Sequence, residues 1–150
     1  MHGYAIRVRY GDTDQMGFAY YANYLRWFEI GRAEMMRSLG MSYRAIEESG
    51  IQLPVMEAHC RYLEPARYDD EVAIETGVAY QGRARVHFGY RIVRVSDGVL
   101  LAHGGTEHCC LDRQGKPVRP PAELVALVSQ APRAEDDSRG SSPHSVSKKA

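Results

Sequence analysis

A single long helical pattern among segments that alternate with period two is the feature that most constrains what this chain can fold into. Over residues 21–39, apolar side chains return every three or four positions and cover more than half of the helix circumference. A helix with so wide an apolar surface has to be enclosed by other elements. The pattern ends at Gly40, a residue type that favours helix C-termini.

Two shorter segments also have helical features. The first lies between Ser42, a capping residue, and Gly50, which ends it. The second covers residues 119–130, with Pro121 near its first turn. Only the pattern over residues 21–39 is long enough to form the centre of the fold.

Five segments alternate between apolar and polar residues, as half-buried strands do. The links between the later segments contain "QG", "SDG" and "RQGK", which are typical of hairpin turns. Antiparallel strands with one apolar face need a single covering layer. We therefore predict an α+β fold, in which a curved antiparallel β-sheet is wrapped round one long central α-helix. The predicted strand segments are residues 4–10, 53–65, 71–81, 82–95 and 98–115.

Length and composition indicate one globular domain. The chain has 150 residues, of which 44% are apolar and 25% charged, so it can bury a core without disulfides or metals as staples. We predict that residues 1–131 form this domain. Residues 132–150 contain one valine as their only sizeable apolar residue, and we expect them to be a disordered C-terminal tail.

The charge balance and the cysteines limit the classes of function. Lys and Arg together number 19, as do Asp and Glu, so the net charge is zero, which argues against binding nucleic acid by bulk charge. The three cysteines form no CxxC pair, and the six histidines show no metal-ligand spacing. No signal peptide or membrane-spanning stretch is evident. We predict free thiols, no membrane span and a cytoplasmic location.

Two aspartates, Asp12 and Asp14, come directly before the long helical pattern. Asp is common in turns and at helix N-caps, which gives both a structural interpretation. A calcium loop of the EF-hand type is excluded, because Met16 and Asn23 would stand at ligand positions. A catalytic carboxylate would lie near a reacting carbonyl, with hydrogen-bond donors aimed at the carbonyl oxygen. The first N–H groups of the helix would supply these donors. The residues alone leave the structural and catalytic interpretations open.

The pattern Y-x-D-T-D-x-x-G-x-x-Y-x-A-N-Y-L-x-W-F-E over residues 10–29 closely resembles the hotdog-fold acyl-CoA thioesterases of the 4-hydroxybenzoyl-CoA thioesterase/YbgC-like group. A weaker likeness, including "YLEPARYDDEVAIET", extends to about residue 120. The resemblance implies the hotdog fold, whose single long helix and order of elements agree with the patterns above.

The resemblance assigns the catalytic carboxylate to Asp14, acting as a nucleophile on the thioester carbonyl or as the base that activates water. It assigns the carbonyl-polarising donor to the backbone N–H of Tyr21, and it implies neither a metal nor a cofactor. Many YbgC-like members carry histidine where this chain has Tyr21, whereas the hydroxybenzoyl-CoA branch carries tyrosine. Gly17 is expected to allow close backbone approach in the connecting loop. Asp12 is assigned to loop structure.

Substrate contacts are expected from one tyrosine and three arginines. Tyr24, beside Tyr20 and Tyr21, either lines an aromatic acyl pocket or fills the core. Because coenzyme A carries phosphates, a protein of zero net charge needs local basic residues to hold it. Arg83 matches a position that contacts the nucleotide in the family, and Arg85 and Arg119 are further candidates. The alternative for each arginine is a solvated side chain on the polar face of the sheet.

The expected function is hydrolysis of a short-chain or aromatic acyl-CoA to the free acid and CoA. The resemblance places the pocket at a subunit interface of a homo-oligomer, a dimer or a homotetramer. The alternative is a non-catalytic module of the same fold that binds acyl-CoA or acyl carrier protein. A related dehydratase would need an Asp/His or Glu pair in the region of the central helix. It is disfavoured, because no histidine occurs between His2 and His59.

Overall fold

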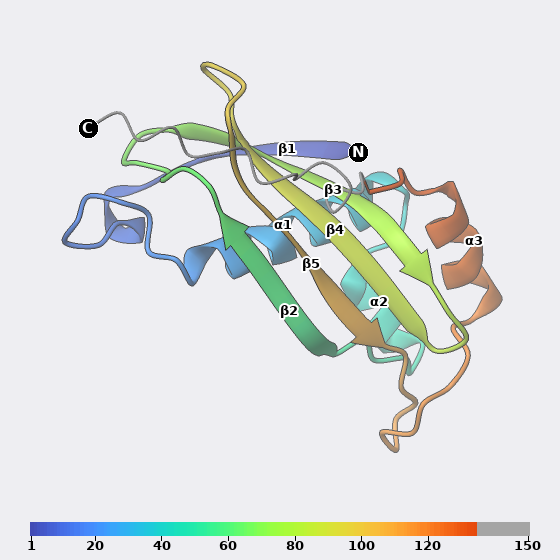
Figure 1. Cartoon of the computed structure of the whole chain (residues 1–150). Helices are drawn as coiled ribbons and strands as arrows, with labels where there is room; N and C mark the ends of the chain where they lie inside the picture. The colour runs from blue at the N-terminus through green and yellow to red at the C-terminus, as the bar shows by residue number, and fades with distance from the viewer. Residues whose placement is uncertain (135–150) are drawn as a thin grey trace, which may run out of the picture.

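The computed structural model describes residues 1–134, apart from the side chains of Tyr43, Tyr80 and Gln81. It contains five strands, three α-helices and one 3-10 turn in this part of the chain (Figure 1). In chain order these are β1 His2–Arg7, η1 Tyr10–Asp12, α1 Asn23–Ser38, α2 Tyr43–Glu48, β2 Val55–Tyr62, β3 Glu71–Gln81, β4 Arg85–Arg94, β5 Leu100–Cys109 and α3 Ala122–Gln130.

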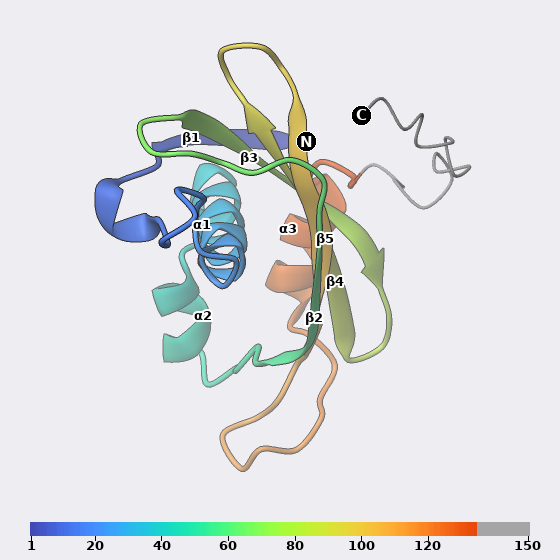
Figure 2. The same cartoon turned by 60° about the vertical axis from the view of Figure 1, so that its left-hand side comes forward.

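The strands form one antiparallel sheet in the order β1-β3-β4-β5-β2. Figure 2 looks nearly along α1 and shows the sheet curving round it. In this view α2 lies below α1, and α3 lies to its right. The predicted α+β hotdog fold is therefore confirmed. β2 lies at one edge of the sheet and pairs only with β5 among the described residues.

The core lies between α1 and the concave face of the sheet. From β4 every second side chain faces the helix and is buried, in keeping with strand alternation. Gly31 brings α1 close to β3, because a Cβ built at this position would lie 2.4 Å from Ile74 Cγ2 and 2.5 Å from Thr76 Oγ1. The buried residues of α1 are Tyr24, Trp27, Phe28, Gly31, Arg32, Met35 and Met36.

The first strand is shorter than the alternation predicts. Ile6 and Val8 face the core as expected, but Tyr10 is 78% exposed and begins the 3-10 turn. The cause is local, because the Asp12 carboxylate accepts a hydrogen bond of 2.9 Å from the N–H of Arg9 and closes the turn. The strand therefore ends before Tyr10.

A buried polar network crosses the core beside α1. The His108 Nδ1 lies 3.0 Å from the carbonyl of Leu53, so this nitrogen carries the proton, and Nε2 accepts from the Thr106 hydroxyl at 2.8 Å. Thr106 in turn accepts from the Tyr90 hydroxyl at 2.7 Å, and Tyr90 accepts from Arg32 at 2.9 Å. Burial lowers the pKa of His108 to about 4, so it is neutral at pH 7.

This shift predicts that the protein loses stability as the pH falls through the range in which only the unfolded state binds a proton. The imidazole of His108 becomes protonated near pH 6.5 when unfolded and near pH 4 when folded. Between pH 7 and pH 5 we expect the free energy of unfolding to fall by about 2 kcal/mol through this group. The free energy of unfolding, measured with urea at both pH values, should fall by this amount in the wild type and in His103→Gln, and by less in His108→Gln. An equal fall between pH 7 and pH 5 in all three proteins would contradict the role assigned to His108.

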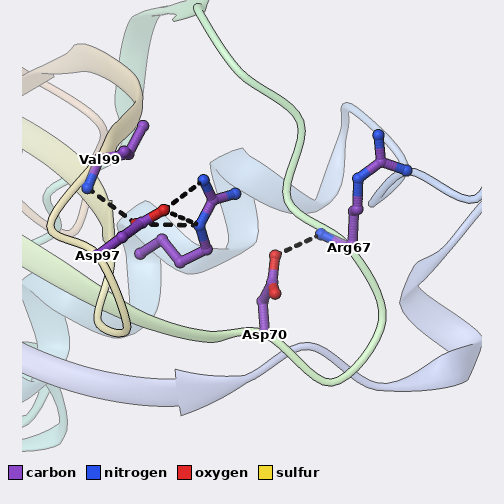
Figure 3. Close-up of polar contacts among 5 residues, drawn as sticks. Arg67, Asp70, Asp97 and Val99 are labelled. Atoms are coloured by element: carbon purple, nitrogen blue, oxygen red, sulfur yellow. Dashed lines mark hydrogen bonds and ion pairs between the residues drawn. The ribbon is translucent and has the colours of Figure 1, made fainter.

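The loop over residues 63–70 links β2 to β3 and passes beside the start of α1. Within it, the Asp70 carboxylate accepts a hydrogen bond of 2.9 Å from the N–H of Arg67 (Figure 3). Figure 3 also shows Asp97 in the β4–β5 turn, where its carboxylate accepts from the N–H of Val99 at 3.2 Å. The guanidinium of Arg94 donates to the same carboxylate and lowers the pKa of Asp97. Both turns are thus fixed by carboxylates.

The segment predicted as a tail starts beside β3. The carbonyl of Pro132 accepts from the N–H of Val78 at 2.8 Å, and the N–H of Ala134 donates to the carbonyl of Val78 at 3.1 Å. Residues 132–134 therefore lie along the same edge of β3 as β1, beyond the first residue of that strand. The rest of the predicted tail, residues 135–150, lies outside the described residues.

Candidate active site

Asp14 is held in a tight turn over residues 14–18. Its Oδ1 accepts hydrogen bonds from the N–H groups of Met16 at 2.9 Å and Phe18 at 3.3 Å. Its N–H donates to the carbonyl of Phe18 at 2.8 Å. Within residues 1–134 nothing bonds to Oδ2, so one oxygen of an oriented, exposed carboxylate is available for chemistry.

Gly17 makes this turn possible through its backbone conformation. Its φ is 77°, a region that side chains disfavour, and its N–H donates to the carbonyl of Asp14 at 3.0 Å. A Cβ added at Gly17 would meet no atom within 4 Å. The close backbone approach expected from the sequence is therefore not seen within residues 1–134, and the requirement for glycine comes from the turn itself.

The same turn occurs a second time, over residues 112–116. There Asp112 Oδ1 accepts from the N–H groups of Gln114 and Lys116, each at 2.9 Å, and Gly115 has a φ of 78°. The turn geometry alone is thus not a catalytic feature. What distinguishes Asp14 is its surroundings, and Asp112 provides a matched control for it.

Asp12 has a structural role. Besides closing the 3-10 turn through its carboxylate, its carbonyl accepts hydrogen bonds from the N–H of Tyr20 at 2.7 Å and from the side-chain amide of Asn23 at 2.9 Å. These bonds tie the loop to the first residue of α1. The structural interpretation of Asp12 is the one that the contacts support.

The residues just before α1 leave backbone donors unused. Helix α1 begins at Asn23, two residues later than the sequence pattern indicates, because residues 20–23 form a turn in which the N–H of Asn23 donates to the carbonyl of Tyr20 at 2.9 Å. In the described part of the chain, the N–H groups of Tyr21 and Ala22 donate to no acceptor. Unpaired N–H groups at a helix N-terminus attract negative charge.

Asp14 and Tyr21 line one cavity of about 340 Å³. Tyr24 forms part of its wall and is also buried in the core, where its hydroxyl accepts a hydrogen bond of 3.1 Å from the N–H of Ala66. Tyr24 therefore belongs to the core and also reaches the cavity, and its contact with an acyl group stays a prediction. The remaining wall is mostly apolar or aromatic and consists of Phe18, Ala19, Tyr62, Leu63, Glu64 and Pro65.

Tyr62 is a residue of this cavity that the sequence patterns did not single out. It ends β2, its hydroxyl donates a hydrogen bond of 2.8 Å to the carbonyl of Tyr21, and its ring lies 4.9 Å from that of Tyr24. Burial raises the pKa of Tyr62, so its hydroxyl keeps its proton at neutral pH. Strand alternation places Tyr62 on the inner face but contains no information about which loop it meets.

The three predicted CoA-binding arginines lie at the other end of the sheet. Arg85 pairs in register with Cys109, close to where β2 begins, whereas β2 ends at the cavity roughly 25 Å further along the strand. Arg85 also forms an ion pair with Glu107. Arg83 and Arg119 are exposed in the loops at the same end as Arg85. Within one chain they do not meet Asp14.

Within residues 1–134, no group of three or more His, Cys, Asp or Glu side chains is arranged to hold a metal ion. None of the helices in this range has the length and apolar character needed to cross a membrane.

Comparison with known proteins shows similarity to thioesterases over most of the chain. Residues 8–128 match the model of the Thioesterase-like superfamily. The chain is 34% identical over 115 residues to a putative acyl-CoA thioesterase, YneP, of Bacillus subtilis, covering 76% of this chain and 83% of the relative. It is 32% identical over 126 residues to the acyl-CoA thioester hydrolase YbgC of Escherichia coli O157:H7, covering 83% and 93%.

Solved structures agree with this assignment. The DHNA-CoA thioesterase from Staphylococcus aureus superposes with a TM-score of 0.80 at 32% identity, covering 85% of this chain and 87% of that structure. The protein from Aquifex aeolicus gives 0.81 at 29% identity, covering 85% and 99%. With its central helix, curved sheet and matching sequence, the chain belongs to the Thioesterase-like superfamily of hotdog-fold enzymes.

Proposed function

We propose that this enzyme hydrolyses the thioester of an aromatic or short-chain acyl-CoA to the free acid and CoA. The observation that supports this most strongly is that one cavity is lined by Asp14, whose Oδ2 accepts no hydrogen bond within residues 1–134, and by Tyr21, whose N–H donates none there. A thioester carbonyl placed between them would meet a carboxylate on its carbon and a donor on its oxygen.

Two routes lead from this arrangement to the products. In the first, Asp14 attacks the carbonyl carbon, the C–S bond breaks, CoA leaves as its thiolate and takes a proton, and water then cleaves the acyl-aspartyl anhydride. In the second, Asp14 removes a proton from water as the water oxygen attacks the carbon directly; the C–S bond then breaks, and the CoA thiolate leaves and takes up that proton. Both develop negative charge on the carbonyl oxygen, and the Tyr21 N–H at the positive end of α1 stabilises it.

The walls of the cavity favour an aromatic acyl group. Tyr62 is 45% exposed and presents ring surface that can stack against a planar substituent, and the cavity is large enough for one or two rings. Among the relatives, a protein of Thermosynechococcus vestitus at 28% identity is named a 1,4-dihydroxy-2-naphthoyl-CoA hydrolase. The substrate in that name is an aromatic acyl-CoA, in keeping with this assignment.

A two-fold dimer through β2 would complete the site. This edge strand exposes apolar side chains at Val55, Met56 and Tyr62, and an open edge favours pairing with a second copy. Antiparallel pairing of two β2 strands brings the start of one strand beside the end of the other. The Arg83 and Arg119 end of one chain would then lie near the Asp14 cavity of its neighbour, within reach of the CoA phosphates.

We therefore expect the protein to be at least a dimer in solution. Replacing both Val55 and Met56 with lysine should place like charges on the pairing edge and yield monomers, with thioesterase activity lost in step. Size-exclusion chromatography with light scattering measures the molar mass, and Val95→Lys, at an exposed apolar side chain outside the edge, is the control. A wild-type monomer that is fully active would contradict the shared site.

The proposed activity is tested by thiol release from a panel of acyl-CoAs, from acetyl through long chains to benzoyl and hydroxybenzoyl. We expect turnover to be fastest with an aromatic or short-chain ester. A protein that binds these esters, or acyl carrier protein, without releasing thiol would instead be the non-catalytic binding module. We also propose that the enzyme acts in the cytoplasm, which cell fractionation would test.

A further inference from the structure

We infer that Tyr62 is a positioning residue for the oxyanion donor, although it lies on a different strand and was not among the residues assigned from the sequence. This inference rests on the proposed function, because it assigns a role to the bond between the Tyr62 hydroxyl and the Tyr21 carbonyl. That bond joins the last residue of β2 to the segment that precedes α1, over 2.8 Å.

The bond acts on the donor through the planarity of the peptide group. The carbonyl of Tyr21 and the N–H of Ala22 belong to one rigid plane, and the N–H of Tyr21 is separated from that plane by a single Cα. Fixing the direction of the carbonyl therefore fixes Ala22 N–H directly and limits the rotation available to Tyr21 N–H. Neither N–H donates to an acceptor within residues 1–134, and Tyr21 is the one of the two residues that lines the cavity.

Without Tyr62 this carbonyl would be held weakly. Its other partner is the N–H of Tyr24, which donates at 3.3 Å, longer than a typical N–H···O bond. Tyr62 supplies the shorter bond, and its ring is itself held edge-on against Tyr24 at 4.9 Å. Because burial raises the pKa of Tyr62, its hydroxyl keeps its proton at neutral pH and is the donor in this bond.

The arrangement also links the subunit edge to the chemistry. β2 is the edge strand, and Tyr62 is its final residue, so any element that orders this edge also orders the Tyr62 hydroxyl and, through it, the helix start. A positioning role predicts a specific kinetic effect. Loss of the hydroxyl should weaken stabilisation that is needed only in the transition state, lowering kcat while leaving KM unchanged.

The test compares Tyr62→Phe, Tyr68→Phe and Asp14→Asn with the wild type on the best ester of the panel. Tyr68 is an exposed tyrosine of the next loop and does not line the cavity, so it controls for loss of a hydroxyl. We expect Tyr62→Phe to lower kcat about tenfold, the effect of one hydrogen bond, with KM within twofold. Backbone amide resonances of Tyr21 and Ala22 should move in Tyr62→Phe and not in Tyr68→Phe.

The outcomes separate this inference from the function on which it rests. If Asp14→Asn is impaired but Tyr62→Phe keeps the wild-type kcat, or raises KM alone, the positioning role is wrong and the proposed function stands. If the amide resonances of Tyr21 and Ala22 do not move in Tyr62→Phe, the role is likewise wrong. If Asp14→Asn turns over at the wild-type rate, the proposed function fails and the positioning role falls with it.

Discussion

Replacing Asp14 with asparagine is expected to lower kcat for thioester hydrolysis by about 10²- to 10³-fold while leaving the fold intact. Asparagine keeps an oxygen that can accept the two N–H bonds of the turn, so the loop should retain its shape. What it loses is the charged Oδ2, the atom that attacks the carbonyl or takes a proton from water. The measurement is kcat and KM for thiol release at pH 7.5.

The second copy of the turn makes this result interpretable. Asp112→Asn removes a charge from the same backbone geometry, with the same pair of N–H donors to Oδ1, but away from the cavity. We expect Asp112→Asn to retain the wild-type kcat. A comparable loss in both variants would mean that a damaged turn, rather than a missing carboxylate, causes the effect.

Replacing Gly104 with alanine is expected to cost about 3 kcal/mol of folding stability, the largest loss that we predict for a single methyl group. A Cβ at this position would lie 2.1 Å from the carbonyl oxygen of His59 and 2.9 Å from Phe28 Cε2. The first of these atoms is backbone and cannot rotate away. Chemical denaturation of the variant against the wild type measures the loss.

Gly104 has this effect because β5, β2 and α1 meet there. Cys60 of β2 is paired with Gly104, and the ring of Phe28 from α1 lies over the same point. A shift of β2 would carry Tyr62 away from Tyr21, so residual activity should fall as well. Gly3→Ala is the control, since a Cβ at Gly3 would meet nothing within 4 Å. Equal stability of the two variants would contradict this description of the core.

Much of the fold could be predicted from the sequence because its elements are specified locally. The alternation of Val86, Phe88, Tyr90 and Ile92 marks the inner face of β4, and the helical spacing marks the buried side of α1. Ser42 begins α2 as predicted, with its hydroxyl accepting a hydrogen bond from Ala45. Each of these signals acts within a few residues, where period and capping chemistry are decisive.

The features that the sequence did not predict depend on side-chain contacts and on strand register, which periodicity does not report. Tyr10 continues the alternation of β1 but lies in a turn, because the nearby carboxylate of Asp12 closes it. Alternation also does not reveal the shift of register between Val78 and Tyr80 in β3. Tyr62 meets Tyr21 across 41 positions of sequence, a contact that no local pattern encodes.

The predicted site residues divide in the same way, into those placed by a local motif and those whose position depends on the course of the whole chain. Asp14 and Tyr21 lie in one motif, and the structure shows both at one cavity, with the backbone groups that their proposed roles require. Arg83, Arg85 and Arg119 were grouped with them by charge and resemblance, yet the direction of β2 separates them from Asp14 within a chain. Their proposed role as phosphate-binding groups therefore depends on the proposed second subunit.

Cleavage by the Asp14 carboxylate of a thioester bound in the cavity beside Tyr21 is tested most directly in a single-turnover experiment. Enzyme is mixed in excess over an aromatic acyl-CoA, and the recovered ligand is identified by mass spectrometry. We predict free acid and CoA from the wild type and from Asp112→Asn, and intact ester bound to Asp14→Asn with a wild-type Kd. Cleavage of the ester by Asp14→Asn at the wild-type rate would contradict the proposed role of Asp14.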